Sequence, residues 1–171
     1  MVVGIDVGGT KIAGAVVARD SSLRATLTLP SPVAGAELID ALVGVVAHLR
    51  AQSSEPIRAV GLGVPSLIDA PTGRVAMTAN LDLADIDVRG VLTERLGIPV
   101  ALDNDGNLAA LGEHRVGAGR EHGDIVMLTI GTGVGGVAVE DLPFGARGVV
   151  LGQAGYPVEQ LRADVVVEPL R

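Results

Sequence analysis

Apolar residues are grouped in short blocks along most of this chain, and glycine-rich turns separate many of the blocks. The first block, Val2–Val17, places two Val- and Ile-rich runs on either side of the turn Gly8-Gly9-Thr10-Lys11. Two such runs joined by a short glycine turn are typical of a β-hairpin. The chain is therefore expected to open with strand, turn and returning strand.

The spacing of apolar residues predicts three helices further along. Leucine and valine recur at helical spacing from Leu38 to Leu49, after the opening pair Ser31-Pro32. A second helix begins at Asp87 and ends at Gly97, which has the residue type of a C-cap. A third helix reaches about Val116. Further strands are expected at residues 23–29, 59–64, 74–77, 98–102, 124–130 and 137–140, with a tight turn at 131–136.

The strand–turn–strand pattern occurs twice, over residues 5–17 and 125–140, with a glycine- and threonine-containing turn each time. The repeat suggests two related subdomains that present phosphate-gripping loops across a cleft. The alternative is coincidence in a chain that contains 24 glycines. The glycine-rich link Gly117–Gly123 is the expected boundary, which divides the chain into residues 1–116 and 117–171.

The composition excludes several classes of function. The chain has 171 residues, 48% of them hydrophobic, which is ample for a core. Phe144 and Tyr156 are its only aromatic residues and the net charge is −7, which argues against a nucleic-acid partner. Without cysteine there can be no disulfide and no thiol catalysis. No signal peptide or membrane-spanning stretch is visible, so we expect a cytoplasmic protein without a membrane partner.

The first glycine turn has residues that suit phosphate oxygens. Backbone N–H groups of Gly8 and Gly9 can approach an anion closely, and Thr10 and Lys11 add a hydroxyl and an ammonium group. Asp6 interrupts the apolar run just before the turn, and a carboxylate there needs a partner or a role. The alternative is a turn that simply needs glycine, with Asp6 solvated at the strand end.

A second polar cluster, Asp103–Asn107, lies where a strand ends and a helix begins. Ligands gather at this end of the strands in open α/β sheets, and the helix N-terminus adds donor groups. Asn104 or Asp105 could instead be a helix N-cap. We favour a hydroxyl-binding site with Asp105 as the acid–base residue. Together with the glycine turns, it suits Mg²⁺-assisted phosphoryl transfer from a nucleotide to an alcohol.

Residues 3–17, 61–65, 103–107 and 130–136, in this order and spacing, resemble the N-terminal half of the ROK-family sugar kinases. That family belongs to the actin-like/hexokinase ATPase superfamily and includes glucokinases, fructokinases and N-acetylmannosamine kinases. The resemblance implies an α/β fold of the ribonuclease H-like (actin-like ATPase) type, a mixed sheet with helices. It further implies a complete first lobe and a truncated second lobe.

The resemblance also implies roles for individual residues. Asp105 would be the base that deprotonates a sugar hydroxyl, usually on carbon 6, and Asn104 would bind the sugar beside it. Asp6 would help to hold Mg²⁺, either directly or through water. The residues implied to contact ATP phosphates are Gly8, Gly9, Thr10, Lys11, Gly131, Thr132, Gly133 and Gly135. The residues that fall where the family lines its sugar pocket are Gly73, Arg74 and Asn80.

The sequence departs from the family after about residue 148. Where the family continues with Gly-Glu-x-Gly-His, this chain has Gly152-Gln153-Ala154-Gly155-Tyr156. Gln153 could still accept a hydrogen bond from a sugar hydroxyl, but Tyr156 cannot replace a zinc-binding histidine. No structural zinc is expected, because the cysteine-rich segment of the family is also missing. The later turn that holds adenosine and the closing helix are missing too.

One strand is expected to need a covering partner. Ile125–Ile130 is almost entirely apolar and should be buried on both faces, but only residues 141–171 remain to cover it. We therefore expect a homo-oligomer or the capture of another partner. His48, His114 and His122 are assigned no ligand role and are expected on helix surfaces or in loops.

The function that these residues and the resemblance imply is that of an ATP-dependent, glucokinase-like sugar kinase. It would transfer the γ-phosphoryl group of ATP to a hydroxyl of a hexose or N-acylhexosamine. The alternative is a truncated, inactive remnant that binds a sugar or a partner. The repressor branch of the family ranks last, because it requires a helix-turn-helix ahead of the hairpin that begins here at Val2.

Overall fold

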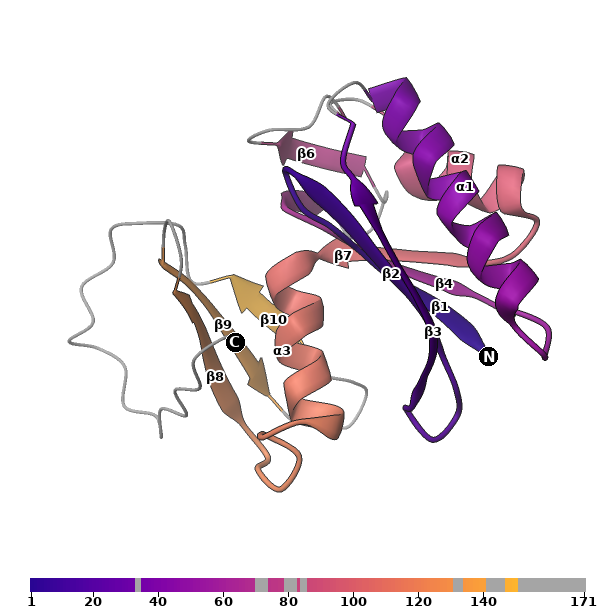
Figure 1. Cartoon of the computed structure of the whole chain (residues 1–171). Helices are drawn as coiled ribbons and strands as arrows, with labels where there is room; N and C mark the ends of the chain where they lie inside the picture. Colours follow the sequence, from indigo (N-terminus) through magenta and orange to yellow (C-terminus); the bar gives the residue numbers. More distant parts are fainter. Residues whose placement is uncertain are drawn as a thin grey trace. The chain divides into compact units, whose positions relative to one another are not determined.

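A computed structural model describes residues 1–32, 35–69, 74–78, 83, 86–130, 134–140 and 147–150 of the chain (Figure 1). The chain forms two compact units, Met1–Asp105 and Gly106–Arg171, which are described separately. The boundary between the units, after Asp105, lies earlier in the chain than the predicted boundary between residues 116 and 117. The division into a first lobe, residues 1–116, and a second lobe, residues 117–171, stays a prediction.

The first unit is built on a five-stranded mixed sheet with the strand order β3-β2-β1-β4-β7. Strand β1 is antiparallel to β2 and parallel to β4, and β4 is parallel to β7. The strands are β1 (Val2–Val7), β2 (Lys11–Val17), β3 (Leu23–Pro30), β4 (Val60–Val64) and β7 (Val100–Asn104). The predicted opening hairpin is thereby confirmed as β1 and β2.

The described residues of the first unit also form two helices and a small hairpin. They are α1 (Gly35–Gln52), α2 (Val88–Leu96), β5 (Ser66–Asp69) and β6 (Arg74–Thr78). The limits of α2 follow from local chemistry, as predicted. Asp87 is the N-cap and accepts a hydrogen bond from the Gly90 nitrogen at 2.8 Å, while Gly97 is the C-cap with a φ of 66°.

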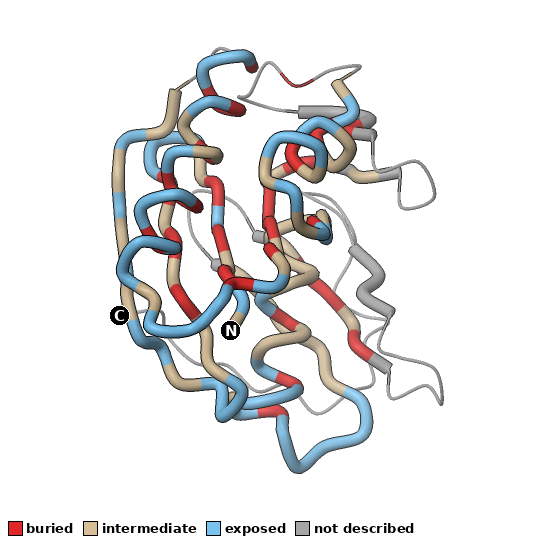
Figure 2. The backbone as a smooth tube through the Cα atoms, turned by 90° about the vertical axis from the view of Figure 1, so that its right-hand side faces the viewer, coloured by how far each residue is buried: buried red, intermediate tan, exposed pale blue. Residues whose placement is uncertain are grey.

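One face of the five-stranded sheet carries the core. Figure 1 shows α1 and α2 on the same side of the sheet, and in Figure 2 the buried positions of the unit recur along the strands and helices that face one another. Alternation along β1 buries Val3, Ile5 and Val7, with exposures of 0%, 5% and 0%. The side chain of Asp6 therefore projects from the opposite face, which these helices do not cover.

The second unit contains a three-stranded antiparallel sheet in the order β10-β9-β8 and helix α3 from its second residue, Gly106, while Asp105 belongs to the first unit. Its elements are α3 (Asp105–Val116), β8 (Ile125–Ile130), β9 (Val134–Glu140) and β10 (Arg147–Val150). A small core joins Ala110 of the helix to Val137 and Val139 of β9. None of the helices in the described residues is long and apolar enough to cross a bilayer.

Three features of the second unit differ from the sequence-based expectations. Ile130 pairs directly with Val134, so the turn between β8 and β9 is shorter than predicted and Gly135 belongs to β9. Residues 125–129 of β8 are half-buried instead of fully buried, because within the described part of the chain β8 pairs with β9 alone. Strand β10 was not predicted.

The position of His114 also differs from the expectation of a surface histidine. The side chain is 7% exposed, since the segment after α3 folds back over it. Its Nε2 lies 3.0 Å from the His122 oxygen and 2.9 Å from the Gly123 oxygen. Both partners are carbonyl acceptors, so Nε2 carries the proton and donates to them.

Candidate functional site

The carboxyl ends of the three parallel strands place two acidic residues in one row of the sheet. Asp6 of β1 pairs with Gly63 of β4, and Gly63 pairs with Asp103 of β7. Paired residues on parallel strands project from the same face, and two strand spacings separate the backbones of Asp6 and Asp103 by about 9–10 Å. Because Gly63 has no side chain, nothing from β4 projects between them. The row Asp6–Gly63–Asp103, in which Gly63 is buried and Asp6 exposed, forms an acidic shelf on the face away from α1 and α2.

Asp105 brings a further carboxylate to the same edge. It is the first residue of α3, directly after β7, and it is half-buried. The pKa of Asp6 is raised above its usual value, chiefly because neighbouring residues of the fold exclude water from part of its carboxylate. The rest of the side chain is exposed to solvent. The negative charge of Asp105 raises this pKa further, and Lys11 opposes the change. Asp6, Asp105 and Lys11 therefore act on one another electrostatically.

The glycine turn between β1 and β2 is held in place by backbone hydrogen bonds. The Gly8 nitrogen donates to the Lys11 oxygen at 2.8 Å, and the Ser31 nitrogen donates to the Thr10 oxygen at 3.1 Å. A Cβ atom on Gly8 would lie only 3.2 Å from the Lys11 oxygen, which is tighter than most side-chain contacts. The exposed residues Gly9, Thr10 and Lys11 remain accessible to an anion.

Asn104, the last residue of β7, is oriented by two hydrogen bonds. Its backbone nitrogen donates to Oδ1 of Asp103 at 2.7 Å, and its side-chain Nδ2 donates to the Ser66 oxygen at 3.2 Å. A backbone carbonyl can only accept, so Nδ2 is the side-chain atom that must face Ser66. The amide of Asn104 is thus held at the same edge as Asp103 and Asp105.

The residues at this edge fit a magnesium ion. The described part of the chain contains no cluster of three or more side chains that could bind a metal on their own. Magnesium, however, is usually held by one or two carboxylates together with substrate phosphates and water. Asp6 and Asp105 supply hard oxygen ligands, and their mutual repulsion is the kind of unfavourable interaction that a divalent cation relieves.

Several predicted site residues fall outside this assembly. Gly73, Asn80, Gly131, Thr132, Gly133 and Gln153 lie outside the described residues. Arg74 is placed only by its backbone, which pairs with Asp69. Gly135 lies in the second unit, opposite Thr129 on β8. Their predicted roles, like those of the residues at the sheet edge, stay predictions. Sequence reasoning did not single out Ser66, because a lone serine after a strand gives no signal.

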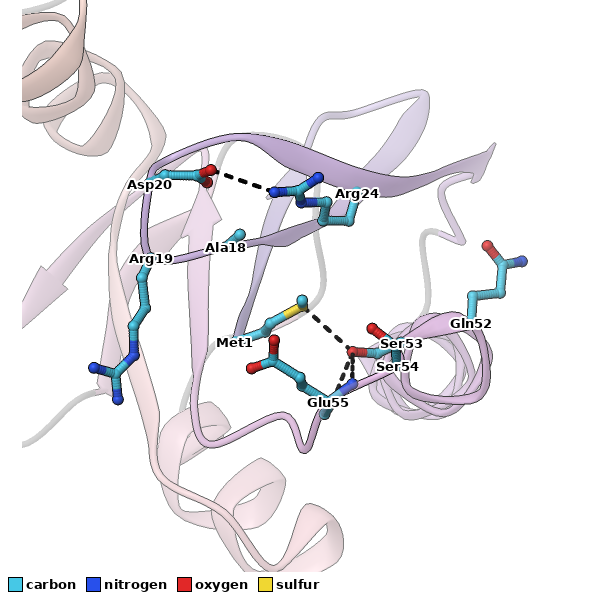
Figure 3. A pocket seen from close by; sticks show the side chains of 9 residues that line it. All are labelled: Met1, Ala18, Arg19, Asp20, Arg24, Gln52, Ser53, Ser54 and Glu55. Atoms are coloured by element: carbon cyan, nitrogen blue, oxygen red, sulfur yellow. Dashed lines mark hydrogen bonds and ion pairs between the residues drawn. The ribbon is translucent and has the colours of Figure 1, made fainter.

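A pocket of about 580 Å³ lies elsewhere in the first unit, at the amino end of β1 (Figure 3). Its lining residues are Met1, Ala18, Arg19, Asp20, Arg24, Gln52, Ser53, Ser54 and Glu55. Arg24 and Asp20 form an exposed ion pair at 3.3 Å, and Ser53 Oγ donates to the Glu55 oxygen at 2.7 Å. None of the predicted site residues lines this pocket, so it is separate from the candidate site.

The mixed α/β fold is that of the actin-like ATPase type seen in solved ROK kinases, and the first unit carries a glycine turn and acidic residues at the carboxyl edge of its parallel strands. The chain belongs to the ROK family, which it matches over residues 2–156.

Characterised proteins that are similar to this chain in sequence or structure include members of the ROK family. The chain is 33% identical over 136 residues to a glucokinase from Streptomyces coelicolor, covering 80% of this chain and 42% of that protein. The structure of a ROK family glucokinase from Streptomyces griseus, in complex with glucose and AMPPNP, superposes with a TM-score of 0.78 at 32% identity, over 89% of this chain and 48% of that one. A xylose repressor from Caldicellulosiruptor bescii is 29% identical over 67% of this chain and 29% of its own length. The chain spans about half the length of the glucokinases it matches.

Proposed function

We propose that this chain provides the sugar- and phosphate-binding lobe of an ATP-dependent sugar kinase. The observation that carries the proposal is the grouping of Asp6, Lys11 and Asp105 at the carboxyl edge of β1, β4 and β7, beside the amide of Asn104. The match to glucokinases, one of them solved with glucose and an ATP analogue, supports a hexose as substrate.

In the proposed reaction, Asn104 orients the sugar and Asp105 accepts the proton of the attacking hydroxyl. The sugar oxygen forms a bond to the γ-phosphorus of ATP while the bond from that phosphorus to the β–γ bridging oxygen breaks, and ADP leaves. The turn Gly8–Lys11 binds phosphate oxygens through the Lys11 ammonium and the N–H groups of its exposed residues, whereas the Gly8 N–H donates to the Lys11 oxygen inside the turn. Bound Mg²⁺, held by Asp6, would supply positive charge to the phosphates.

The second candidate function is sugar binding without phosphoryl transfer. It is supported by the similarity to a xylose repressor from Caldicellulosiruptor bescii, whose name refers to a sugar and to no transfer reaction. In this case the edge formed by Asn104 and Asp105 would still bind hydroxyl groups, but the nucleotide would not be held for reaction.

A coupled assay of ADP release with glucose, mannose, fructose and N-acetylmannosamine distinguishes the two functions, with calorimetric titration of the same sugars beside it. A kinase should release ADP with at least one sugar, and Asp105→Asn should lower the rate by about 10²–10⁴-fold. Asp40→Asn is the matched control, because this carboxylate pairs with Arg95 on the helix surface. Sugar binding with no ADP release would support the second function, and no binding of any sugar would exclude both.

A further inference from the structure

Ser66 lies at the start of β5, directly after Pro65 and the carboxyl end of β4. Its backbone oxygen accepts the hydrogen bond from Nδ2 of Asn104 at 3.2 Å. This contact places Ser66 beside the residue to which the proposed function assigns the sugar. It also places Ser66 at the same edge of the sheet as Asp103 and Asp105.

The Ser66 hydroxyl is buried without a hydrogen bond. The residue is 5% exposed, and its Oγ atom has no partner among the described residues. Leaving a buried hydroxyl unpaired costs about 1–3 kcal/mol, and most buried polar groups in proteins are paired. An unpaired buried hydroxyl beside a candidate substrate-binding amide therefore requires an explanation.

The fold itself gives no reason for a hydroxyl at this position. Strand β5 pairs with β6 through backbone groups, with Ser66 opposite Thr78. The bond to Asn104 uses the backbone oxygen of Ser66 and would be unchanged with alanine in its place. Alanine would fill nearly the same volume and would bury no unpaired polar atom.

We propose that Ser66 is a sugar-binding and specificity-determining residue whose Oγ pairs with a hydroxyl group of the sugar held by Asn104. This inference rests on the proposed function. A sugar hydroxyl both donates and accepts, as the serine hydroxyl does, so the two groups are complementary. Rotation about the Cα–Cβ bond re-aims Oγ between its staggered positions without moving the backbone.

The burial of Ser66 also explains how it would discriminate between sugars. Where water is excluded, an analogue that lacks the pairing hydroxyl leaves the serine unpaired, and the site rejects such an analogue strongly. An epimer that turns the same hydroxyl away loses the same bond. Ser66 should therefore control which position and configuration of the sugar is accepted.

The test is a comparison of the wild-type chain with Ser66→Ala by calorimetric titration. The probes are glucose, mannose, fructose and N-acetylmannosamine, followed by the mono-deoxy analogues of whichever sugar binds. Ser66→Ala should weaken binding of the parent sugar by about 5–100-fold. The analogue that lacks the pairing hydroxyl should bind the variant as well as the parent sugar does, whereas the other analogues should still lose affinity.

Ser54→Ala is the matched control, because Ser54 is an exposed serine of the separate pocket near Met1. It should bind every probe as the wild type does, and thermal unfolding should show that both variants are folded. If the wild type binds a sugar and Ser66→Ala binds all probes equally well, Ser66 has no such role while the proposed function stands. If the wild type binds no sugar, both proposals are wrong.

Discussion

Asp6 lies on β1 and Asp105 is the first residue of α3, so most of the first unit separates them in sequence, yet the charge of Asp105 raises the pKa of Asp6. The parallel pairing of β1, β4 and β7 brings them to one edge of the sheet. Two like charges at one edge make this region less stable than two neutral residues would. Such unfavourable interactions are typical of functional sites, where both carboxylates are needed to bind a ligand or a cation.

The first prediction concerns Asp6 and pH. Because the folded-state pKa of Asp6 is raised above its ordinary value of 3.8, its protonated form favours folding. That contribution is fully present below the ordinary pKa and is lost as the pH rises through the raised value. Asp6→Asn should therefore increase the free energy of unfolding, more at pH 7 than at pH 3, as measured by urea denaturation.

Asp20 offers a control of opposite sign. Hydrogen bonds from the Ser22 hydroxyl and backbone nitrogen lower the pKa of this exposed carboxylate. Its contribution to stability is present above the ordinary pKa and is lost as the pH falls. Asp20→Asn should reduce stability at pH 7 and have less effect at pH 3. Equal shifts for both variants across this range would contradict the interpretation of Asp6.

The second prediction concerns the acidic shelf between Asp6 and Asp103. A side chain at position 63 would project from the same face as both carboxylates and between them. If the chain is an active kinase, Gly63→Val should therefore abolish sugar-dependent ADP release. If it does not turn over, Gly63→Val should weaken binding of Mg·ATP by at least about tenfold. Calorimetric titration with Mg·ATP measures the second effect.

Gly61 provides the control on the same strand. It lies two residues before Gly63 on the same face of β4, opposite Gly4, and a Cβ atom there would meet no atom within 4 Å. Gly61→Val should bind Mg·ATP as the wild type does. Equal losses in the two variants would show that valine in β4 disturbs the sheet itself, not the shelf.

The third prediction concerns helix stability. Gly97 ends α2 with a φ of 66°, which side chains other than glycine adopt at a cost of about 1–2 kcal/mol. Gly97→Ala should lower the free energy of unfolding by about that amount in urea denaturation.

Gly44→Ala is the control, with an expected effect of opposite sign. It lies exposed within α1 with no atom near its would-be Cβ, and should raise stability by about 0.5–1 kcal/mol.

The fourth prediction concerns His114. Its imidazole ties the end of α3 to the carbonyl groups of His122 and Gly123. His114→Ala should increase hydrogen exchange at the amide of His122, which donates to the Gly119 oxygen, and lower stability by about 1–3 kcal/mol. The exposed His48→Ala should leave that exchange unchanged, and if it does not, the effect is not specific to the bridge.

Local chemistry explains which parts of the fold could be predicted from the sequence. The glycine turn after β1 and the cap residues of α2 each depend on a few adjacent residues, and the structure has both where the sequence placed them. The helix α1 follows from an apolar spacing that is continuous from Leu38 to Leu49. In these cases the conformation is determined within one element.

The features that were missed depend on contacts between distant segments. The row Asp6–Gly63–Asp103 exists only through the pairing of three strands. His114 is buried because a polar, glycine-rich segment folds back over it, although that segment has no apolar pattern of its own. The unpaired hydroxyl of Ser66 likewise has no counterpart in the periodicity of the sequence.

The bond from the Ser31 nitrogen to the Thr10 oxygen has a consequence for anion binding. Together with the bond inside the turn, it fastens the tip of the hairpin to the segment that leads into α1. A loop that is already ordered loses little conformational entropy when a ligand arrives, so more of the interaction energy remains as affinity. Proline has no N–H to donate, so replacing Ser31 with proline would remove this bond and leave the tip of the hairpin less ordered. Binding a phosphate group would then cost more conformational entropy.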